Sequence, residues 1–191
     1  MKLAQAIEVA LTGSEIQKDM LESAFGEIMD GQAEPVQIAG LLVALRAKGE
    51  TVDEIIAAAR ALRARATTTK AEAPNTIDVC GTGGSGVDTF NISTTAAFVV
   101  AGAGIPVAKH GNRAATSRSG SFDVLEALGV NIEIPIESCG KILSEIGIAT
   151  FFARTAHPAF RHVAPVRQQL GVRTLMNCLG PLLNPAGVQH Q

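Results

Sequence analysis

A run of four glycines in six residues, GTGGSG at positions 81–86, constrains the fold of this chain more than any other feature. The run follows a short apolar segment, TIDVC at 76–80, and precedes a stretch with helical character. Glycines let backbone N–H groups approach an anion closely, and the N-terminus of a helix adds a favourable electrostatic field. The order of strand, glycine loop and helix therefore predicts an anion-binding loop within an α/β domain.

The loop also matches the dinucleotide-binding pattern GxGxxG, which requires an acidic residue about 20 positions later to hold a ribose hydroxyl. No acid lies between Asp88 and Asp123, and the loop lacks the Lys-Ser/Thr ending of a Walker loop. These two facts disfavour both nucleotide-binding motifs. A purely structural glycine turn is also disfavoured, because the loop stands between a strand and a helix.

Beyond the loop, strand and helix signals alternate along the chain. The expected strands cover 76–80, 105–109, 131–134 and 148–153, and the expected helices cover 93–103, 121–128, 137–146 and 159–170. Such alternation is typical of βαβ units. We therefore expect residues 76–191 to form an α/β domain with a mostly parallel sheet and flanking helices.

Residues 1–66 have a different pattern, with four short apolar segments at helical spacing. Potential capping boxes stand at Ser14–Gln17 and Thr51–Glu54, and Pro35 suits a first helical position. No chemical motif lies in this region, so we expect a helical packing or dimerisation domain. The polar segment 67–75 predicts a linker to the α/β domain.

Composition excludes several classes of partner. The formal net charge is −2 and both Trp and Tyr are absent, which disfavours binding to nucleic acid. The longest apolar run, 96–108, contains two glycines and a proline, so it is too broken to cross a membrane. Cys80, Cys139 and Cys178 lack metal-ligand spacing and predict reduced, mostly buried thiols. We expect a cytoplasmic protein.

Polar residues cluster at two places after the glycine loop. The first, TFNISTT at 89–95, has more hydroxyl groups than one helix cap needs, and they suit phosphate oxygens or the water-rich shell of Mg²⁺. The second, KHGNRAATSRSGS at 109–121, carries three cations at the end of an expected strand, where parallel sheets bind ligands. Together the clusters predict an anion cradle, although each residue alone could be a cap or a solvated surface residue. Arg167 alone would be an exposed helix residue.

Three segments, DVCGTGGSGVDTFNIST, VAKHGNRAATSRSGS and APVRQQLGVRTLMNCLGPLLNP, together resemble the anthranilate phosphoribosyltransferase family. The segment QIAGLLVALRAKGET resembles that family's N-terminal domain, so the resemblance covers essentially the whole chain. It implies a fold like that of nucleoside phosphorylases and phosphoribosyltransferases. From the helical pattern of residues 1–66 we expect a homodimer formed through the helical domain. The implied activity, in tryptophan biosynthesis, transfers a phosphoribosyl group from phosphoribosyl pyrophosphate to the amine of anthranilate, with Mg²⁺ as cofactor.

The resemblance also implies roles for particular residues. Ser93 would contact Mg²⁺, whereas Gly81, Asn112 and Arg167 would meet anthranilate, with Arg167 pairing with its carboxylate. The residues implied to line the phosphoribosyl pyrophosphate site are Gly81, Gly84, Ser85, Thr89, Asn91, Ile92, Ser93, Thr94, Lys109, His110, Gly111, Asn112, Arg113, Ala114, Ala115, Thr116, Ser117 and Ser121.

The chain departs from the family pattern in two ways. Ser85 stands where the family loop usually has an acidic residue, as in GTGGDG. The family also has an adjacent Asp-Glu pair further towards its C-terminus that holds Mg²⁺, and the 191 residues of this sequence end before any such pair. We therefore expect an N-terminal portion or a truncated form, with an incomplete sheet and little activity by itself. A nucleoside phosphorylase-like enzyme and a non-catalytic phosphate-binding paralogue are the alternatives.

Overall fold

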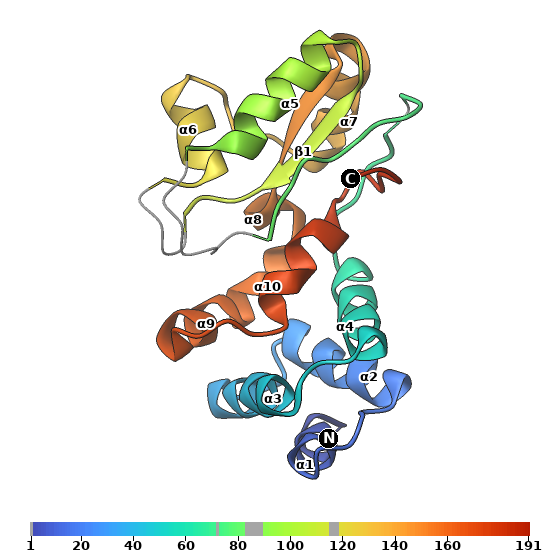
Figure 1. Cartoon of the computed structure of the whole chain (residues 1–191), viewed down its shortest axis with the longest axis vertical. Helices are drawn as coiled ribbons and strands as arrows, with labels where there is room; N and C mark the ends of the chain where they lie inside the picture. The colour runs from blue at the N-terminus through green and yellow to red at the C-terminus, as the bar shows by residue number, and fades with distance from the viewer. Residues whose placement is uncertain (1, 72, 83–89, 115–118) are drawn as a thin grey trace. The chain divides into compact units, whose positions relative to one another are not determined.

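The computed structural model describes residues 2–71, 73–82, 90–114 and 119–191, which form two compact units (Figure 1). The first unit comprises Met1–Ala66 and Pro158–Leu183, and the second comprises Thr67–His157 and Asn184–Gln191. Each unit therefore combines two stretches that are far apart in the sequence.

The chain begins with the four helices expected from its apolar periodicity. They are α1 (Lys2–Leu11), α2 (Lys18–Met29), α3 (Pro35–Lys48) and α4 (Val52–Arg63). Pro35 occupies the first turn of α3, where a missing N–H breaks no helical hydrogen bond. Gly49 ends the same helix with a φ of +89°, a conformation that favours glycine.

The expected helix at 159–170 is divided in the structure. A 3₁₀ helix, η1, covers Pro158–His162, and α9 covers Ala164–Leu170. Pro165 explains the division, because a residue without an N–H donor fits the first turn of a new helix but not the interior of a longer one. Two short elements follow, α10 (Met176–Leu179) and η2 (Gly180–Leu183). Four residues are too few to give a periodic signal in the sequence.

The core of the first unit contains side chains from both of its stretches. Phe25 of α2 and Leu41 of α3 are fully buried, and Val166 of α9 and Leu179 of α10 belong to the same cluster. Burial of one such side chain stabilises a fold by about 1.5–3 kcal/mol. The helical unit therefore contains residues 158–183 in addition to the expected 1–66.

Glu54 is a fully buried acid that connects three parts of the helical unit. Its carboxylate accepts hydrogen bonds from the backbone N–H groups of Ile16 and Thr51, both at 2.9 Å, and from the Lys48 ammonium at 2.8 Å. The Thr51 hydroxyl accepts a bond from the Glu54 N–H in return, which confirms this capping box.

The capping box expected at Ser14–Gln17 is wrong. Helix α2 begins at Lys18, and Gln17 precedes it without a side-chain capping bond to a described residue. The backbone N–H of Ile16 is held by Glu54 instead, so a long-range contact overrides the local motif.

The second unit confirms the α/β class. Its elements are α5 (Ile92–Gly102), β1 (Val107–Gly111), α6 (Ser121–Ala127), α7 (Ile136–Ile146), β2 (Ile148–Phe152) and α8 (Ala153–Ala156). The two strands pair in parallel, from Val107 beside Ile148 to Gly111 beside Phe152. Helix α5 packs against both strands and α7 packs against β2 (Figure 1). Within the described residues, the sheet has these two strands.

The strand expected at 131–134 is wrong, because these residues belong to no strand. Ile132 is buried against Phe122, Leu125 and Phe152. The alternating apolar pattern therefore reflects packing of a connecting segment rather than pairing in a sheet.

The strand expected at 76–80 is reduced to one paired residue. Ile77 forms isolated parallel bridges to Val107 of β1 and to His190 near the end of the chain. The polar segment before it also lies along the second unit, since the N–H groups of Thr67 and Thr69 donate to the carbonyls of Ala156 and Pro185.

The three cysteines were expected to be reduced and mostly buried. All three cysteines are free, but only Cys139 is buried, so the expectation of mostly buried thiols is wrong. Cys178 is exposed on the short helix α10.

Among the described residues, no helix has the length and apolar character needed to cross a membrane.

Replacing Glu54 with Ala leaves the Lys48 ammonium and two backbone N–H groups without their acceptor. We expect the free energy of unfolding of the helical unit to fall by about 3–5 kcal/mol, measured by urea denaturation followed by circular dichroism. Asp53→Asn is the matched control, because Asp53 is exposed in the same helical turn. A loss for Glu54→Ala as small as that of the control would contradict the stabilising role of Glu54.

The same contacts predict a dependence on pH. Burial acts to raise the pKa of Glu54, but the hydrogen bonds from Ile16, Lys48 and Thr51 outweigh it and hold the pKa below its usual value. A carboxyl with a lowered pKa stabilises the fold above its unfolded pKa, and this stabilisation is lost as the pH falls through the folded pKa. The difference between wild type and Glu54→Ala should therefore shrink in acid.

Candidate functional site

The polar residues of the second unit gather at the carboxyl end of β1. Lys109 and His110 are residues of this strand, and both are buried rather than exposed on a surface loop. The bridge between Ile77 and Val107 brings the segment before the glycine loop beside the same strand. Since parallel sheets bind ligands beyond the carboxyl ends of their strands, this edge is the candidate site.

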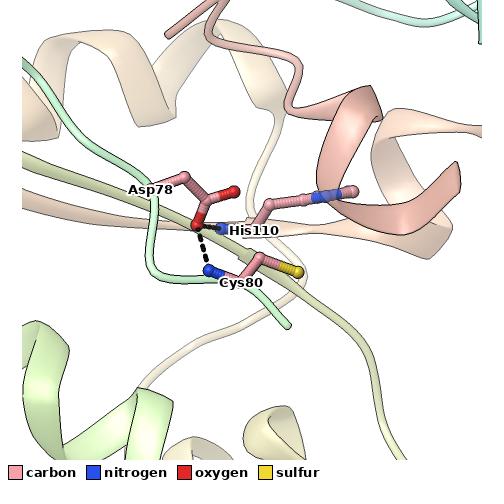
Figure 2. Close-up of side chains that lie close together, drawn as sticks. All are labelled: Asp78, Cys80 and His110. Atoms are coloured by element: carbon pink, nitrogen blue, oxygen red, sulfur yellow. Dashed lines mark hydrogen bonds between the residues drawn. The ribbon is translucent and has the colours of Figure 1, made fainter. Parts of the chain in front are cut away.

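Asp78 is the fully buried centre of this edge (Figure 2). Its Oδ1 accepts hydrogen bonds from the backbone N–H of Cys80 at 3.0 Å and of His110 at 3.1 Å. Its Oδ2 accepts a bond from the side-chain amide of Asn184 at 2.8 Å. Burial raises the pKa of Asp78, and the bonds from Asn184 and His110 oppose that rise. The three donors compensate part of the desolvation of the carboxylate.

Lys109 supplies a positive charge in this buried region. Its side chain is only 1% exposed, and burial lowers the pKa of its ammonium group, while Cys80 and Asp78 act in the opposite direction. Burial also raises the pKa of the Cys80 thiol to about 11, and the charge of Asp78 adds to the rise. At neutral pH Cys80 is therefore a neutral thiol rather than a reactive thiolate.

Asp78, Cys80 and His110 place three potential metal-ligand atoms within 4.8 Å of one another. Their chemistry does not suit a metal ion, however. The Asp78 carboxylate already accepts three hydrogen bonds, and Lys109 adds positive charge nearby. We interpret the group as a hydrogen-bonding centre that fixes the backbone around it.

His110 packs against a second buried histidine, His157. The ring centroids lie 5.3 Å apart and the ring planes are inclined at 71°, an edge-to-face arrangement. His157 follows α8, so it adds a second imidazole beside a residue implied to contact phosphate.

The backbone at the end of β1 lies close to the start of α6 at two glycines, Gly111 and Gly120. A Cβ atom at Gly111 would lie 2.6 Å from the Ser121 hydroxyl oxygen, and one at Gly120 would lie 2.3 Å from the backbone nitrogen of Ala114. The carbonyl of Asn112 accepts a bond from the Ser121 hydroxyl at 3.3 Å. Only glycine fits at positions 111 and 120 without a shift of these neighbours.

Asp123 of α6 closes the base of the same loop. Its Oδ2 accepts hydrogen bonds from the backbone N–H of Ala114 at 2.8 Å and of Gly120 at 2.6 Å. These two bonds hold the pKa of Asp123 below its usual value. One ionised side chain therefore holds Ala114 and Gly120 close to each other.

Arg113 is engaged within the protein rather than directed to an open anion site. Its guanidinium donates to Glu126 at 2.8 Å, reaches Glu133 at 3.5 Å, and lies 5.2 Å from the centre of the Phe152 ring. The hydrogen bond with Glu126 raises the pKa of Arg113. Its positive charge is therefore largely balanced by acids of the same unit.

The first turn of α5 carries part of the first polar cluster, TFNISTT at 89–95. Asn91 precedes the helix, and its side chain makes no capping bond within the part of the chain that the structure describes. The Thr94 hydroxyl is buried and has no hydrogen-bond partner among the described residues. Donor groups that the fold leaves uncommitted at a helix N-terminus suit an anionic ligand.

Ser93 lies half-buried in the same turn, and its hydroxyl oxygen is a hard donor of the type that Mg²⁺ accepts. One hydroxyl fits Mg²⁺ only as one ligand among several, because the ion demands six and usually retains waters or phosphate oxygens. The described residues therefore fit a Mg²⁺ ion that arrives with a phosphate ligand.

The remaining implied residues have varied surroundings. Gly81, Ile92 and Asn112 are exposed, and Gly111, Ala114 and Ser121 are half-buried. The expectations for six residues lie outside the described part of the chain, namely those for Gly84, Ser85, Thr89, Ala115, Thr116 and Ser117.

Arg167 belongs to α9 in the first unit, where it is half-buried rather than exposed. Burial lowers the pKa of its guanidinium, and no carboxylate among the described residues pairs with it. A half-buried guanidinium without an internal carboxylate is a suitable partner for a carboxylate ligand.

Sequence reasoning missed three residues that organise the site: Asp78, Asp123 and Asn184. The Asn184-Pro185 step lies after a Pro/Gly segment, and no local pattern connects it to Asp78, 106 positions earlier. Asp123 stands three residues after Gly120, a spacing that could have indicated a carboxylate returning to a helix N-terminus.

Gly120→Ala forces a Cβ atom against the backbone of Ala114, so the two ends of the loop must separate. We expect a loss of about 1–3 kcal/mol in stability, measured by thermal unfolding, together with faster hydrogen exchange of the Ala114 amide. Gly102→Ala is the control, because a Cβ atom there meets open space.

Asp123→Asn should increase exchange at the same amide, because the charged acceptor is lost. In the wild type this acceptor is present at neutral pH and is lost as the pH falls through the lowered pKa of Asp123. Equal exchange at Ala114 in Gly120→Ala, Asp123→Asn and wild type would contradict the role of Asp123 in holding Ala114 beside Gly120.

Comparison with known proteins gives matches along the whole chain. Residues 4–66 match the helical bundle domain of a glycosyl transferase family, and residues 73–191 match the a/b domain of such a family. The anthranilate phosphoribosyltransferase of Anaeromyxobacter sp. (strain K) is 54% identical over 189 residues, which is 99% of this chain and 56% of that protein. The chain thus spans about half the length of the curated relatives it matches.

Two solved structures are also similar. The anthranilate phosphoribosyltransferase of Thermus thermophilus superimposes with a TM-score of 0.90 at 50% identity, covering 95% of this chain and 55% of that one. The Saccharomyces cerevisiae enzyme in complex with PRPP and Mg gives 0.88 at 29% identity, covering 96% and 55%. Since the two family matches follow the helical and α/β parts in order, the chain belongs to the glycosyl transferase family that combines a helical bundle with an α/β domain.

Proposed function

We propose that this chain binds phosphoribosyl pyrophosphate and serves the transfer of its phosphoribosyl group to the amine of anthranilate, with release of pyrophosphate. The observation that carries the proposal is the 54% identity to an anthranilate phosphoribosyltransferase across 99% of the chain. The reaction would belong to tryptophan biosynthesis. The polar edge at the end of β1 supports it, because a phosphorylated ligand needs fixed N–H and hydroxyl donors.

The chemistry fits a site without a strong base. Pyrophosphate leaves with several negative charges, so donors placed at the leaving group lower the barrier. The amine of anthranilate is nucleophilic when neutral, and positioning supplies much of the remaining rate. Asp78 already accepts backbone hydrogen bonds and the Cys80 thiol is neutral, so neither group is available as a strong base.

The phosphoribosyl pyrophosphate site, in this proposal, uses the first turn of α5 and the segment after β1. Asn91, Ser93 and Thr94 supply side-chain donors, and Thr94 has a buried hydroxyl with no partner among the described residues. Mg²⁺ would be held by Ser93 with phosphate oxygens and water, and when bound it would neutralise charge on the leaving pyrophosphate. Buried Lys109 contributes long-range positive charge to the same edge.

Arg167, in this proposal, recognises the carboxylate of anthranilate. Its planar guanidinium can donate to both carboxylate oxygens. The half-buried position of Arg167, without an acidic partner in the described ranges, supports the role.

The test is a titration of the chain with phosphoribosyl pyrophosphate and Mg²⁺ by calorimetry, followed by anthranilate. We expect Arg167→Ala to weaken anthranilate binding about tenfold or more and to leave phosphoribosyl pyrophosphate affinity unchanged. Arg60→Ala is the control, because Arg60 is an exposed arginine on α4.

One result would decide against the proposal. No heat with millimolar phosphoribosyl pyrophosphate and Mg²⁺ would contradict binding. Little N-(5-phosphoribosyl)anthranilate, measured by chromatography, is expected from this chain by itself, and turnover at a normal rate would contradict that expectation.

A homodimer formed through the helical unit is part of the proposal. Val36 and Val43 of α3 and Val52 and Ile56 of α4 expose apolar surface, and Val36 is 76% exposed. A cytoplasmic location is also proposed, supported by the three free cysteines.

Sedimentation velocity tests the dimer. We expect a species of twice the chain mass that Val36→Glu shifts towards monomer, since a charge in an apolar interface must be desolvated. Val172→Glu is the control, because Val172 is also exposed but lies in the later stretch of the same unit. A wild-type chain that sediments only as a monomer would overturn this part.

A further inference from the structure

One oxygen atom of Asp78 joins two separate segments of the candidate site. Oδ1 accepts the N–H of Cys80, which leads into Gly81, and the N–H of His110, which leads into Gly111 (Figure 2). Two amides that share one acceptor cannot move apart without breaking a hydrogen bond. The position of Asp78 therefore sets the spacing between the two segments.

Asn184 fixes the orientation of this carboxylate. Its amide nitrogen donates to Asp78 Oδ2 and to the carbonyl of Ala108, both at 2.8 Å, and its amide oxygen accepts the N–H of Ala186 at 2.9 Å. Asn184 and Asp78 are both buried, so water cannot replace these bonds readily. The side-chain amide thus holds the carboxylate against β1.

We propose that Asp78, oriented by Asn184, is a positioning residue for phosphoribosyl pyrophosphate, which rests on the proposed function. It touches no ligand itself. It holds the backbone that leads into the glycine loop and the backbone at the end of β1 at the spacing that one phosphorylated ligand requires. An acceptor-only group is needed, because all three of its partners are N–H donors.

Asp78→Asn tests this requirement with almost no change of shape. The amide oxygen can still accept two N–H groups, but the amide nitrogen then faces the amide nitrogen of Asn184, and two donors repel. We expect the affinity for phosphoribosyl pyrophosphate with Mg²⁺ to fall about tenfold or more, measured by calorimetry at a temperature where circular dichroism shows the variant folded.

The double variant Asp78→Asn with Asn184→Asp restores a donor facing an acceptor. It should recover part of the lost affinity, but not all, because a carboxylate at position 184 cannot donate to the carbonyl of Ala108. A purely structural role would not give this rescue of affinity among folded variants.

Thr76→Val is the matched control. Thr76 is buried in the same segment, and its hydroxyl donates to the Ala73 carbonyl at 2.6 Å without joining the two segments. It should lower stability and leave affinity within twofold of wild type. If Asp78→Asn does not fold, Asn184→Ser takes its place, with a smaller loss of affinity expected.

The outcomes separate the two proposals. If wild type binds phosphoribosyl pyrophosphate and folded Asp78→Asn binds it equally well, the positioning role is overturned. If wild type does not bind, the proposed function fails and the positioning of this ligand fails with it. Hydrogen exchange at the Cys80 and His110 amides tests the link itself: faster exchange at both in Asp78→Asn supports a link between the two segments through Asp78, and unchanged exchange overturns it.

Discussion

The architecture of the second unit depends on one buried carboxylate and the donors that satisfy it. A buried carboxylate without partners is strongly unfavourable. Asp78 avoids that penalty only when the segment before the glycine loop, the end of β1 and the segment around Asn184 all come together. The same requirement that stabilises the carboxylate therefore selects one path of the chain around it.

Asp123 uses the same interaction in a less buried place. Both acids bind backbone N–H groups. Asp78 binds that of His110 in β1, and Asp123 binds those of Ala114 and Gly120 after the strand. The cations of this stretch are used differently, since Arg113 pairs with Glu126 and Lys109 is buried. In the proposed function, recognition of an anion would therefore depend more on the geometry of backbone and hydroxyl donors than on an exposed cluster of positive side chains.

The sequence was informative where a local pattern determined the structure. Pro35 and the Thr51–Glu54 capping box follow from spacing and propensity alone. The two parallel strands do so as well, but the strand expected at 105–109 lies at 107–111. The strand expected at 131–134 failed, because apolar alternation reports burial and cannot distinguish pairing from packing.

Long-range contacts made the organisation of the site unpredictable. Asp78 and Asn184 form a hydrogen bond across 106 positions, and no periodic pattern in the sequence indicates such a contact. The charge of Arg113 gave no sign that Glu126 would balance it. The residue types suited to phosphate could be read from the sequence, whereas Asp78, Asp123 and Asn184, which hold the backbone around them, could not.

The discontinuous second unit has a consequence for the order in which the chain folds. On the ribosome, residues 67–157 emerge before Asn184 and His190, which bond to Asp78 and Ile77. Until those residues appear, Asp78 lacks the amide donor of Asn184, and Ile77 lacks its bridge to His190. Contacts of such large sequence separation slow folding, because the loop between them must close first. The site at the end of β1 should therefore be among the last parts of the described chain to form during synthesis.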